Sequence, residues 1–296
     1  MSVKPVKVVA EPSATKKSAQ IRVYEPGGGG LLERGVWREM VLELVRSREL
    51  IWRLFVRDLI ARYKQSVLGV LWAFLPPVAT TVMFTFLNGE GIIVVEDTEI
   101  PYPAYVFLSI SLWQLFASGL ALTTGSLTAA GRMIVKINFP REVLVISALG
   151  QAVFEFLIRV ILVAVVFAWF GVRPSWGALM AIGPLALLLM LTLALGLGLS
   201  ILNGVMRDVG QAVPMLTTLL MFLTPVIYPP VAVERVSLLN LVNPTAPLLN
   251  AARDLILHGT VRSPAELTIA GIVSVVLLAV SWRVFHMAEP MIAERI

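Results

Sequence analysis

The sequence predicts an all-α integral membrane protein in which an amphipathic interfacial helix precedes six transmembrane helices, with short re-entrant helices between spans five and six. Three observations predict this fold class. Of 296 residues, 57% are hydrophobic and 15% are charged, with a mean hydropathy of +0.84, values atypical of a soluble domain. Several charge-free runs are long enough to cross a bilayer. More than half of the 24 Lys and Arg residues lie before residue 65, so the basic character is local.

Residues 1–30 are predicted to form a disordered cytoplasmic tail. Their longest apolar run, Val8-Val9-Ala10, is far too short for the core of a signal peptide. Three prolines and the run Gly27–Gly30 leave too little apolar surface for independent folding. The glycine run matches no phosphate-binding motif, because no Lys-Ser or Lys-Thr follows it. We therefore interpret it as a linker.

Residues 31–66 are predicted to form the amphipathic interfacial helix. Apolar side chains recur at helical spacing from Trp37 to Tyr63, with basic side chains on the other faces. A helix of this kind can lie in the headgroup plane with its apolar side in the acyl boundary. A soluble helix packed on a partner is the alternative, because Glu39, Glu43 and Glu49 dilute the basic face.

Residues 67–296 are predicted to form the six-span domain. The first run without a charge has 21 residues, and at about 1.5 Å per residue it crosses a hydrocarbon core of about 30 Å. The six predicted spans are Val67–Leu87, a span within Ile100–Gly131, Val143–Phe170, Pro174–Met206, Val209–Val233 and Leu267–Phe285. Span three contains Glu155 and Arg159, four residues apart on one helical face, and we expect them to pair inside the membrane. The sequence leaves open whether this pair lines a polar path or only holds helices together.

Loop charges predict a multi-pass protein of the cytoplasmic (inner) membrane with both termini in the cytoplasm. The loop Asn88–Glu99 contains four acids and no Lys or Arg, whereas the next loop contains Arg132, Lys136 and Arg141. The external segment Pro229–Glu266 is too apolar for a plain loop. Its pattern predicts two short re-entrant helices, the second capped by Thr245 and ended by Gly259 in a left-handed turn.

Several kinds of chemistry are disfavoured. The chain has no cysteine and only two histidines, His258 and His286, so we expect neither redox chemistry nor a metal site. No G-x-x-x-x-G-K-[ST] motif occurs, and no soluble stretch is long enough for an ATPase. Any ATP must therefore be used by another chain. Without a motif for an enzyme nucleophile or metal centre, a conduit or a scaffold remains.

A family resemblance begins in the interfacial segment. Arg57-Asp58-Leu59, the run Arg62–Gly69, Leu71-Trp72 and Leu75-Pro76-Pro77 resemble the start of bacterial polysaccharide export permeases, the membrane subunits of ABC-2 type transporters. The resemblance covers about residues 33 to 285 and includes Lys136–Glu142, Arg207-Asp208, Asn243-Pro244 and Pro247. It implies a homodimer of six-span subunits, with two cytoplasmic ABC ATPase subunits as partners. It also implies export of a lipid-linked glycan such as O-antigen, capsule, teichoic acid or galactan.

The same resemblance implies that this chain is not an enzyme and binds no cofactor, because ATP and Mg²⁺ belong to the partner ATPase. Membrane lipid is a further expected partner, and nucleic acid is not. Two alternatives stay open. An ABC-2 drug or lipid exporter would share the six spans without needing a wide aromatic path, and an integral-membrane enzyme or scaffold of envelope assembly would need no ATPase.

Candidate residues for substrate recruitment end the interfacial helix. Arg57, Arg62, Tyr63 and Lys64 lie next to span one, at the depth of lipid phosphates, where a pyrophosphate-linked substrate would present additional negative charge. The alternative is that these cations only anchor the helix and fix the topology.

Candidates for the path and its gate lie in the spans. A glycan tunnel benefits from aromatic platforms with scattered polar groups; the candidates are Trp72, Phe74, Phe84, Trp113, Gln114 and Phe116, of which only a minority are expected to line it. Pro76 and Pro77 are predicted to kink span one, and Pro225 lies at the far end of span five. These kinks can serve a moving gate or be static. The stripe Ala117, Ala121, Gly125 and Ala129 predicts close packing of another helix.

The loop from Arg132 to Glu142 is a candidate for docking into a cleft of the ATPase, because it combines apolar anchors with cations. The residues proposed for this coupling are Arg132, Met133, Lys136, Ile137, Phe139 and Arg141. A simple positive-inside loop is the alternative.

Overall fold

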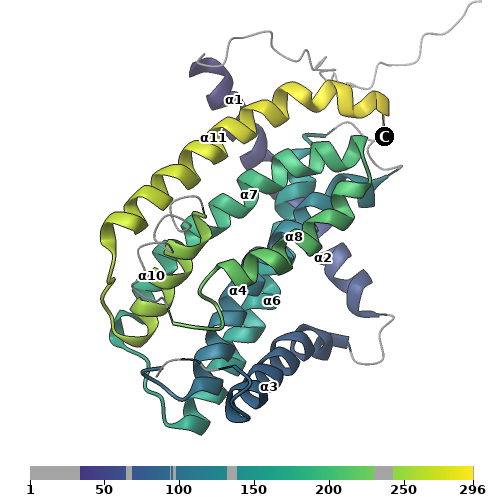
Figure 1. Ribbon diagram of the computed structural model, residues 1–296. Helices are drawn as coiled ribbons and strands as arrows, with labels where there is room; N and C mark the ends of the chain where they lie inside the picture. Colours follow the sequence, from purple (N-terminus) through teal and green to yellow (C-terminus); the bar gives the residue numbers. More distant parts are fainter. Residues whose placement is uncertain are drawn as a thin grey trace, which may run out of the picture.

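The computed structural model describes residues 34–64, 69–93, 95, 98–131, 139–229 and 243–295, and every regular element among them is a helix. Within these described ranges, four helices are long and apolar enough to cross a membrane. They are α4 (Tyr102–Ala130), α6 (Glu142–Phe170), α7 (Ile182–Val205) together with the 3-10 turn η2 (Trp176–Ala181), and α11 (Pro264–Arg295), of which Pro264–Glu289 is the candidate span (Figure 1).

Helix α4 is the centre of the bundle. In its most apolar stretch 72% of the residues are buried, against 17% in α6 and 22% in α11. Both α6 and α7 pack on α4, and α11 packs on α7. The outer helices expose large apolar side chains such as Trp169, Ile161 and Ile272. A protein with this distribution needs an apolar solvent around its outer helices, as a lipid bilayer provides.

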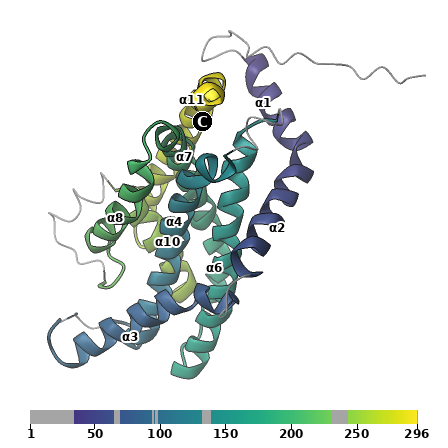
Figure 2. The same cartoon turned by 90° about the vertical axis from the view of Figure 1, so that its right-hand side faces the viewer.

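Two predicted spans correspond to shorter helices. Span one is divided into the 3-10 turn η1 (Gly69–Ala73) and α3 (Leu75–Gly89), and span five contains α8 (Asp208–Leu223). Helices of 15 and 16 residues cover about 23 Å, less than a hydrocarbon core of about 30 Å. Figure 2 shows α3 projecting from one end of the bundle at a steep angle to α6. The described residues therefore give four candidate spans.

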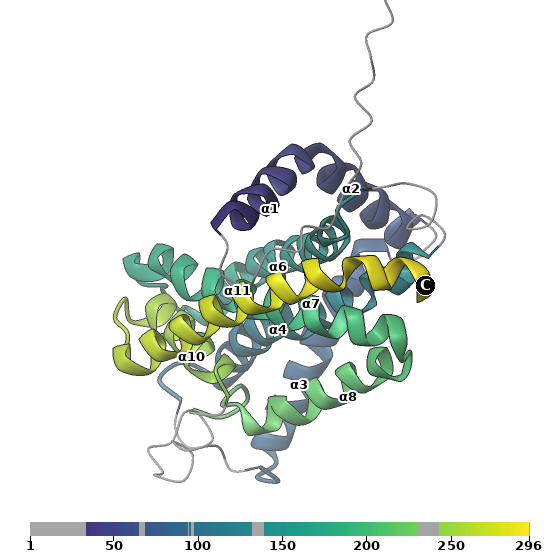
Figure 3. The same cartoon turned by 90° about the horizontal axis from the view of Figure 1, so that it is seen from above.

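The predicted interfacial helix is divided into α1 (Arg34–Arg46) and α2 (Arg48–Lys64). Helix α2 lies along α6. The Phe55 ring packs against Gly150, where an added Cβ would lie 3.2 Å from the ring. The same ring meets the Phe154 ring edge-on, with 6.4 Å between the ring centroids. Helix α1 contacts α11 through the edge-to-face pair Trp37 and Trp282. Figure 3 shows α1 and α2 as an arc along the side of the bundle formed by α6. The boundaries at residues 30 and 66 fall outside the described residues.

Only the second predicted short helix of the external segment lies within the described residues, as α10 (Thr245–Leu257), which is buried along most of its length. Its predicted cap is wrong: Asn243 Oδ1 accepts the Thr245 backbone N–H at 3.1 Å, so Asn243 does the capping. Its predicted end is confirmed, because Gly259 follows with φ +76° and its N–H donates to the carbonyls of Asp254 and Leu255. The re-entrant position of α10 stays a prediction.

Glycines allow α4 and α7 to cross closely. A Cβ on Gly196 would lie 2.2 Å from Thr123 Oγ1, and one on Gly119 would lie 2.9 Å from Thr192 Cγ2. Asn203 extends the contact, donating to the Thr124 carbonyl at 3.1 Å. Small residues that let two backbones approach are a common basis of helix association in membranes.

Gly196→Ala is therefore expected to force α4 and α7 apart and to lower the free energy of unfolding by about 1–3 kcal/mol. The matched control is Gly198→Ala on the same helix, where a Cβ meets no heavy atom within 4 Å. That change should leave stability equal or slightly higher, because alanine favours helix. Thermal unfolding in detergent measures both. Equal losses in the two variants would show that this crossing is not close.

Candidate functional site

Two adjoining cavities lie between the end of α2, the start of α3, α4 and α6. The larger has a volume of about 480 Å³, within the range of about 300–1,000 Å³ typical of ligand pockets. Its polar and aromatic lining consists of Arg62, Tyr63, Trp72, Gln114, Ser118, Glu155 and Arg159. The smaller, of about 290 Å³, includes Arg57, Gly125, Ala129 and Gln151. Arg62, Ala121 and Leu122 line both, so the two cavities form one hollow along α4.

Three charged side chains meet at this hollow. Glu155 Oε2 accepts from Arg159 Nη2 at 2.9 Å, and Glu155 Oε1 accepts from Arg62 Nη1. Glu155 and Arg159 are 7% and 3% exposed. The single carboxylate bridges two guanidinium groups, so the cluster keeps a net positive charge while its buried members are compensated.

Arg62 is the member of this cluster whose position could not be read from the sequence. The spacing of Glu155 and Arg159 predicts that they face each other, whereas Arg62 lies 93 residues before Glu155. Only the packing of α2 against α6 brings them together. No local pattern signals such a contact.

Tyr63 adds a hydroxyl to the lining of the larger cavity. Burial raises the pKa of the Tyr63 hydroxyl, and the charge of Glu155 raises it further. The phenol therefore stays protonated at neutral pH and can donate a hydrogen bond. Lys64 is exposed and is not among the residues that line either cavity.

The structure brings two of the six aromatic and polar path candidates to the hollow, Trp72 and Gln114. Phe84, Trp113 and Phe116 are no more than 3% exposed and belong to the hydrophobic core around α4, where the last two rings lie 5.4 Å apart. Phe74 is half-buried and lies outside the lining of both cavities. Trp72 is 53% exposed, so it is the aromatic side chain best placed to meet a ligand here.

The small-residue stripe on α4 does not pack as predicted. Ala121, Gly125 and Ala129 line the smaller cavity, and a Cβ on Gly125 meets no heavy atom within 4 Å. The close contacts of α4 with α7 are made instead at Gly119, which lies two residues from Ala121 and therefore on nearly the opposite side of the helix. Small side chains here leave space beside the charged cluster.

The candidate gate prolines lie at helix ends. Pro76 and Pro77 occupy the first turn of α3, where a missing N–H requires no partner, so the chain changes from η1 to α3 instead of kinking within one helix. Pro76 also lines the larger cavity. The carbonyl of Pro225, just after α8, accepts from Arg253 Nη1 at 3.0 Å.

Arg253 is a structural anchor that the sequence analysis missed. Its side chain is buried, donates to Ser109 Oγ at 3.1 Å and stacks over the Tyr105 ring at 4.7 Å. It thereby joins α10, α4 and the segment after α8. The sequence signal for this anchor is a single basic residue within an apolar helical stripe. A guanidinium group buried there requires several hydrogen-bond partners.

Of the predicted ATPase-coupling residues, Arg132, Met133, Lys136 and Ile137 lie outside the described residues. Phe139 is partly buried against the cluster of Leu54, Leu127 and Val143. Arg141 contacts α11: its backbone N–H donates to Glu289 Oε1 at 3.1 Å and its guanidinium donates to the Glu289 carbonyl. The described part of this segment is thus held against the bundle.

Comparison with known proteins identifies the family to which this chain belongs. The family model of the ABC-2 type transporter matches residues 49–257. The chain is 29% identical over 261 residues to the O-antigen export system permease protein RfbA of Myxococcus xanthus, covering 87% of this chain and 99% of that one. It is 28% identical over 245 residues to the protein of the same name from Klebsiella pneumoniae, covering 80% and 91%. Since the family match spans most of the chain, including α2 and all the helices around the hollow, the chain belongs to the ABC-2 type transporter family.

Proposed function

We propose that this chain is the permease subunit of a system that exports a lipid-linked polysaccharide across the cytoplasmic membrane. Family membership and the two relatives named as O-antigen export permeases support a transport role. The observation that carries the proposal is the hollow beside Arg62, Glu155 and Arg159. It combines positive charge, an exposed indole and open space at the junction of α2 with the span helices.

The proposed assembly has two copies of the chain, each with six spans, and two copies of an ABC ATPase. Spans one and five would include α3 and α8. Both termini would face the cytoplasm, α1 and α2 would lie at the membrane surface, and α10 would enter the outer leaflet and return. ATP and Mg²⁺ would bind the ATPase, docked at the segment Arg132–Glu142.

The chemistry of the hollow suits a pyrophosphate-linked glycan. Guanidinium groups pair well with phosphate oxygens through charge-assisted, bidentate hydrogen bonds, and the two arginines of the cluster share a single carboxylate. The Tyr63 hydroxyl and the Gln114 amide can serve sugar hydroxyls or phosphate oxygens. The Trp72 indole offers an apolar face for sugar C–H groups.

Replacing Arg62 and Lys64 together with alanine is expected to reduce export. Losing even one charge-assisted hydrogen bond, worth about 1.5–3 kcal/mol, would weaken substrate binding more than tenfold. Surface glycan and intracellular lipid-linked glycan are measured in parallel, with copurified ATPase as the measure of assembly. The matched control, Arg38→Ala with Arg48→Ala, removes the same charge from exposed positions on α1 and α2. Normal surface glycan in the first variant would exclude a recruitment role for these two cations.

The proposed function itself is tested by purification and by deletion. Purification of the tagged chain from its own cells is expected to yield an ABC ATPase subunit in equal amount. Deletion of the chain is expected to leave lipid-linked glycan inside the cell and none at the surface. A chain that purifies alone and remains active, or a deletion that leaves surface glycan unchanged, would contradict the proposal.

A further inference from the structure

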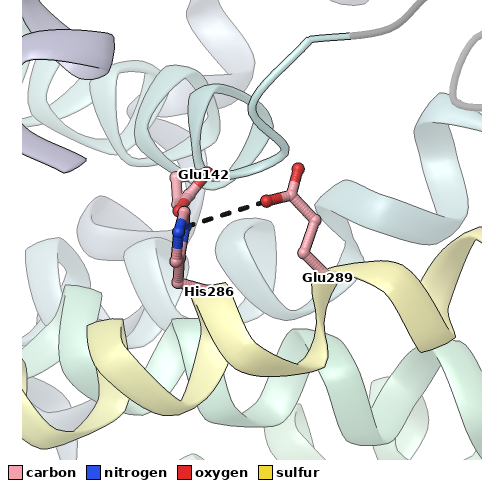
Figure 4. Close-up of side chains that lie close together, drawn as sticks. All are labelled: Glu142, His286 and Glu289. Atoms are coloured by element: carbon pink, nitrogen blue, oxygen red, sulfur yellow. Dashed lines mark hydrogen bonds and ion pairs between the residues drawn. The ribbon is translucent and has the colours of Figure 1, made fainter. Parts of the chain in front are cut away.

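Three potential metal ligands converge where α6 begins and α11 ends. Glu142 is the first residue of α6, and His286 and Glu289 lie three residues apart on α11. His286 Nδ1 is 3.2 Å from Glu142 Oε1 and 3.9 Å from Glu289 Oε2. Figure 4 shows the imidazole of His286 beside the Glu142 carboxylate, with a dashed line joining it to the Glu289 carboxylate. One ligand atom from each residue lies within 4.8 Å of the others.

This cluster is buried, and one of its oxygens is left unsatisfied. Glu142 and Glu289 are 5% and 7% exposed. Glu142 Oε2 is buried and accepts no hydrogen bond from any residue in the described part of the chain. A buried carboxylate oxygen without a donor is strongly unfavourable, and natural structures normally satisfy such groups with a partner or an ion. The unsatisfied oxygen is therefore available to a bound cation.

The spacing of the ligand atoms suits a small divalent ion. Zinc binds imidazole nitrogen and carboxylate oxygen at about 2.0–2.2 Å, which in a tetrahedral site puts neighbouring ligand atoms about 3.4 Å apart. The two distances from His286 Nδ1, 3.2 Å and 3.9 Å, lie on either side of that value. The ligand atoms of Glu142 and Glu289 lie within 4.8 Å of each other, so side-chain rotations that bring them closer would complete the geometry.

A second layer of contacts orients one of the ligands. The Arg141 backbone N–H donates to Glu289 Oε1 at 3.1 Å, and the Arg141 guanidinium donates to the Glu289 carbonyl. Glu289 Oε2 is left on the side of His286. Contacts of this kind to a ligating carboxylate are typical of metal sites.

We propose that Glu142, His286 and Glu289 bind one divalent transition-metal ion of the zinc class, with water in a fourth position. A ligand set of one imidazole and two carboxylates favours Zn²⁺ or Mn²⁺ over Mg²⁺, which selects oxygen ligands alone. Because Glu142 directly follows Arg141, the ion would fasten the end of α11 to α6 beside the segment proposed to dock the ATPase. This site departs from the expectation that two histidines leave no room for a metal.

The sequence could not show the cluster because Glu142 and His286 are 144 residues apart. Their distance in the fold depends on α6 and α11 meeting at one end of the bundle. Helix α1 adds a further acid to this end. Burial raises the pKa of the Glu43 carboxyl, while nearby His286 lowers it and Glu142 raises it.

The test uses the full-length chain in lipid nanodiscs, with any purification tag removed and bound metal stripped by a chelator. Titration with ZnCl₂, followed by calorimetry and elemental analysis, is expected to give one Zn²⁺ per chain and a rise in unfolding temperature. His286→Ala is expected to weaken binding about 100-fold or more, at least as much as the loss of a supporting contact around a metal. The chain offers a matched control, because His258 is its other histidine and pairs with Glu99 at 2.6 Å, away from this cluster. His258→Ala should bind zinc as the unaltered chain does.

A second variant and a second probe keep the proposal open to refutation if His286→Ala fails to fold. Glu142→Gln preserves the shape of the side chain and is expected to lose zinc binding as well. Cobalt(II) added to the unaltered chain should give the intense visible absorption of a four-coordinate site. The proposal is overturned if the stripped chain takes up no stoichiometric Zn²⁺, which would mean that a protonated His286 alone serves the carboxylates. It is equally overturned if zinc binds the folded His286→Ala or Glu142→Gln variants as tightly as the His258→Ala control.

Discussion

Glu155→Ala is expected to lower the free energy of unfolding by about 3–5 kcal/mol, the range found when one partner of a buried ion pair is removed. Arg159, 3% exposed, would keep its charge in the bundle without the carboxylate that lies 2.9 Å away. Arg62 would lose the same partner, loosening α2 from α6. Thermal or denaturant unfolding of the purified chain measures the loss.

Two comparison variants separate burial from charge. Glu49→Ala breaks the Arg53–Glu49 pair, whose side chains are more than 70% exposed, and should change stability little because surface pairs contribute little. Glu155→Leu combined with Arg159→Met replaces the pair with apolar side chains of similar size and should recover stability. Export should stay low in this double variant, because the hollow has lost one of the two guanidinium groups of the cluster and the carboxylate that positions the other. If Glu155→Ala is as mild as Glu49→Ala, the pair is not buried as described.

Gly125→Phe is expected to abolish export while leaving the fold intact. A Cβ at this position meets no heavy atom within 4 Å, and the side chain would enter the cavity of about 290 Å³ beside Arg57 and Gln151. A ring can therefore be accommodated without moving a helix, but it would occupy space that the glycan or its lipid-linked head is proposed to use. Surface glycan, measured together with the amount of folded permease, reports the effect.

Gly198→Phe is the matched control for this experiment. It adds the same bulk at an open glycine on α7 that is not among the residues lining either cavity. Export should continue in that variant. If a well-folded Gly125→Phe permease exports normally, the substrate does not pass along this face of α4, and the hollow must be assigned another role.

The sequence could predict the features that follow from local spacing. Long charge-free runs must form helices in a bilayer because the backbone has no other partners there, and α4, α6, α7 and α11 appear as expected. The pairing of Glu155 with Arg159 follows from the helical repeat. The left-handed turn at Gly259 follows from the absence of a Cβ.

Other features depend on packing between distant segments, which no local pattern contains. Trp113, Gln114 and Phe116 are close neighbours in sequence, yet one lines the hollow and two lie in the core, because α4 is surrounded by other helices. The stripe containing Gly125 suggested tight packing, but the partner helix crosses α4 at Gly119 instead. Whether small residues indicate a contact or a cavity is decided by the neighbouring helix.

Reconstitution of the chain with its copurified ATPase in liposomes tests the central claim most directly. Lipid-linked glycan is supplied on the ATPase side, and a membrane-impermeant glycosidase on the other side reports its arrival. The account predicts cleavage that requires ATP and both proteins, with no ATP hydrolysis by the permease alone. Cleavage without the ATPase, or ATP hydrolysis by this chain unaided, would contradict it.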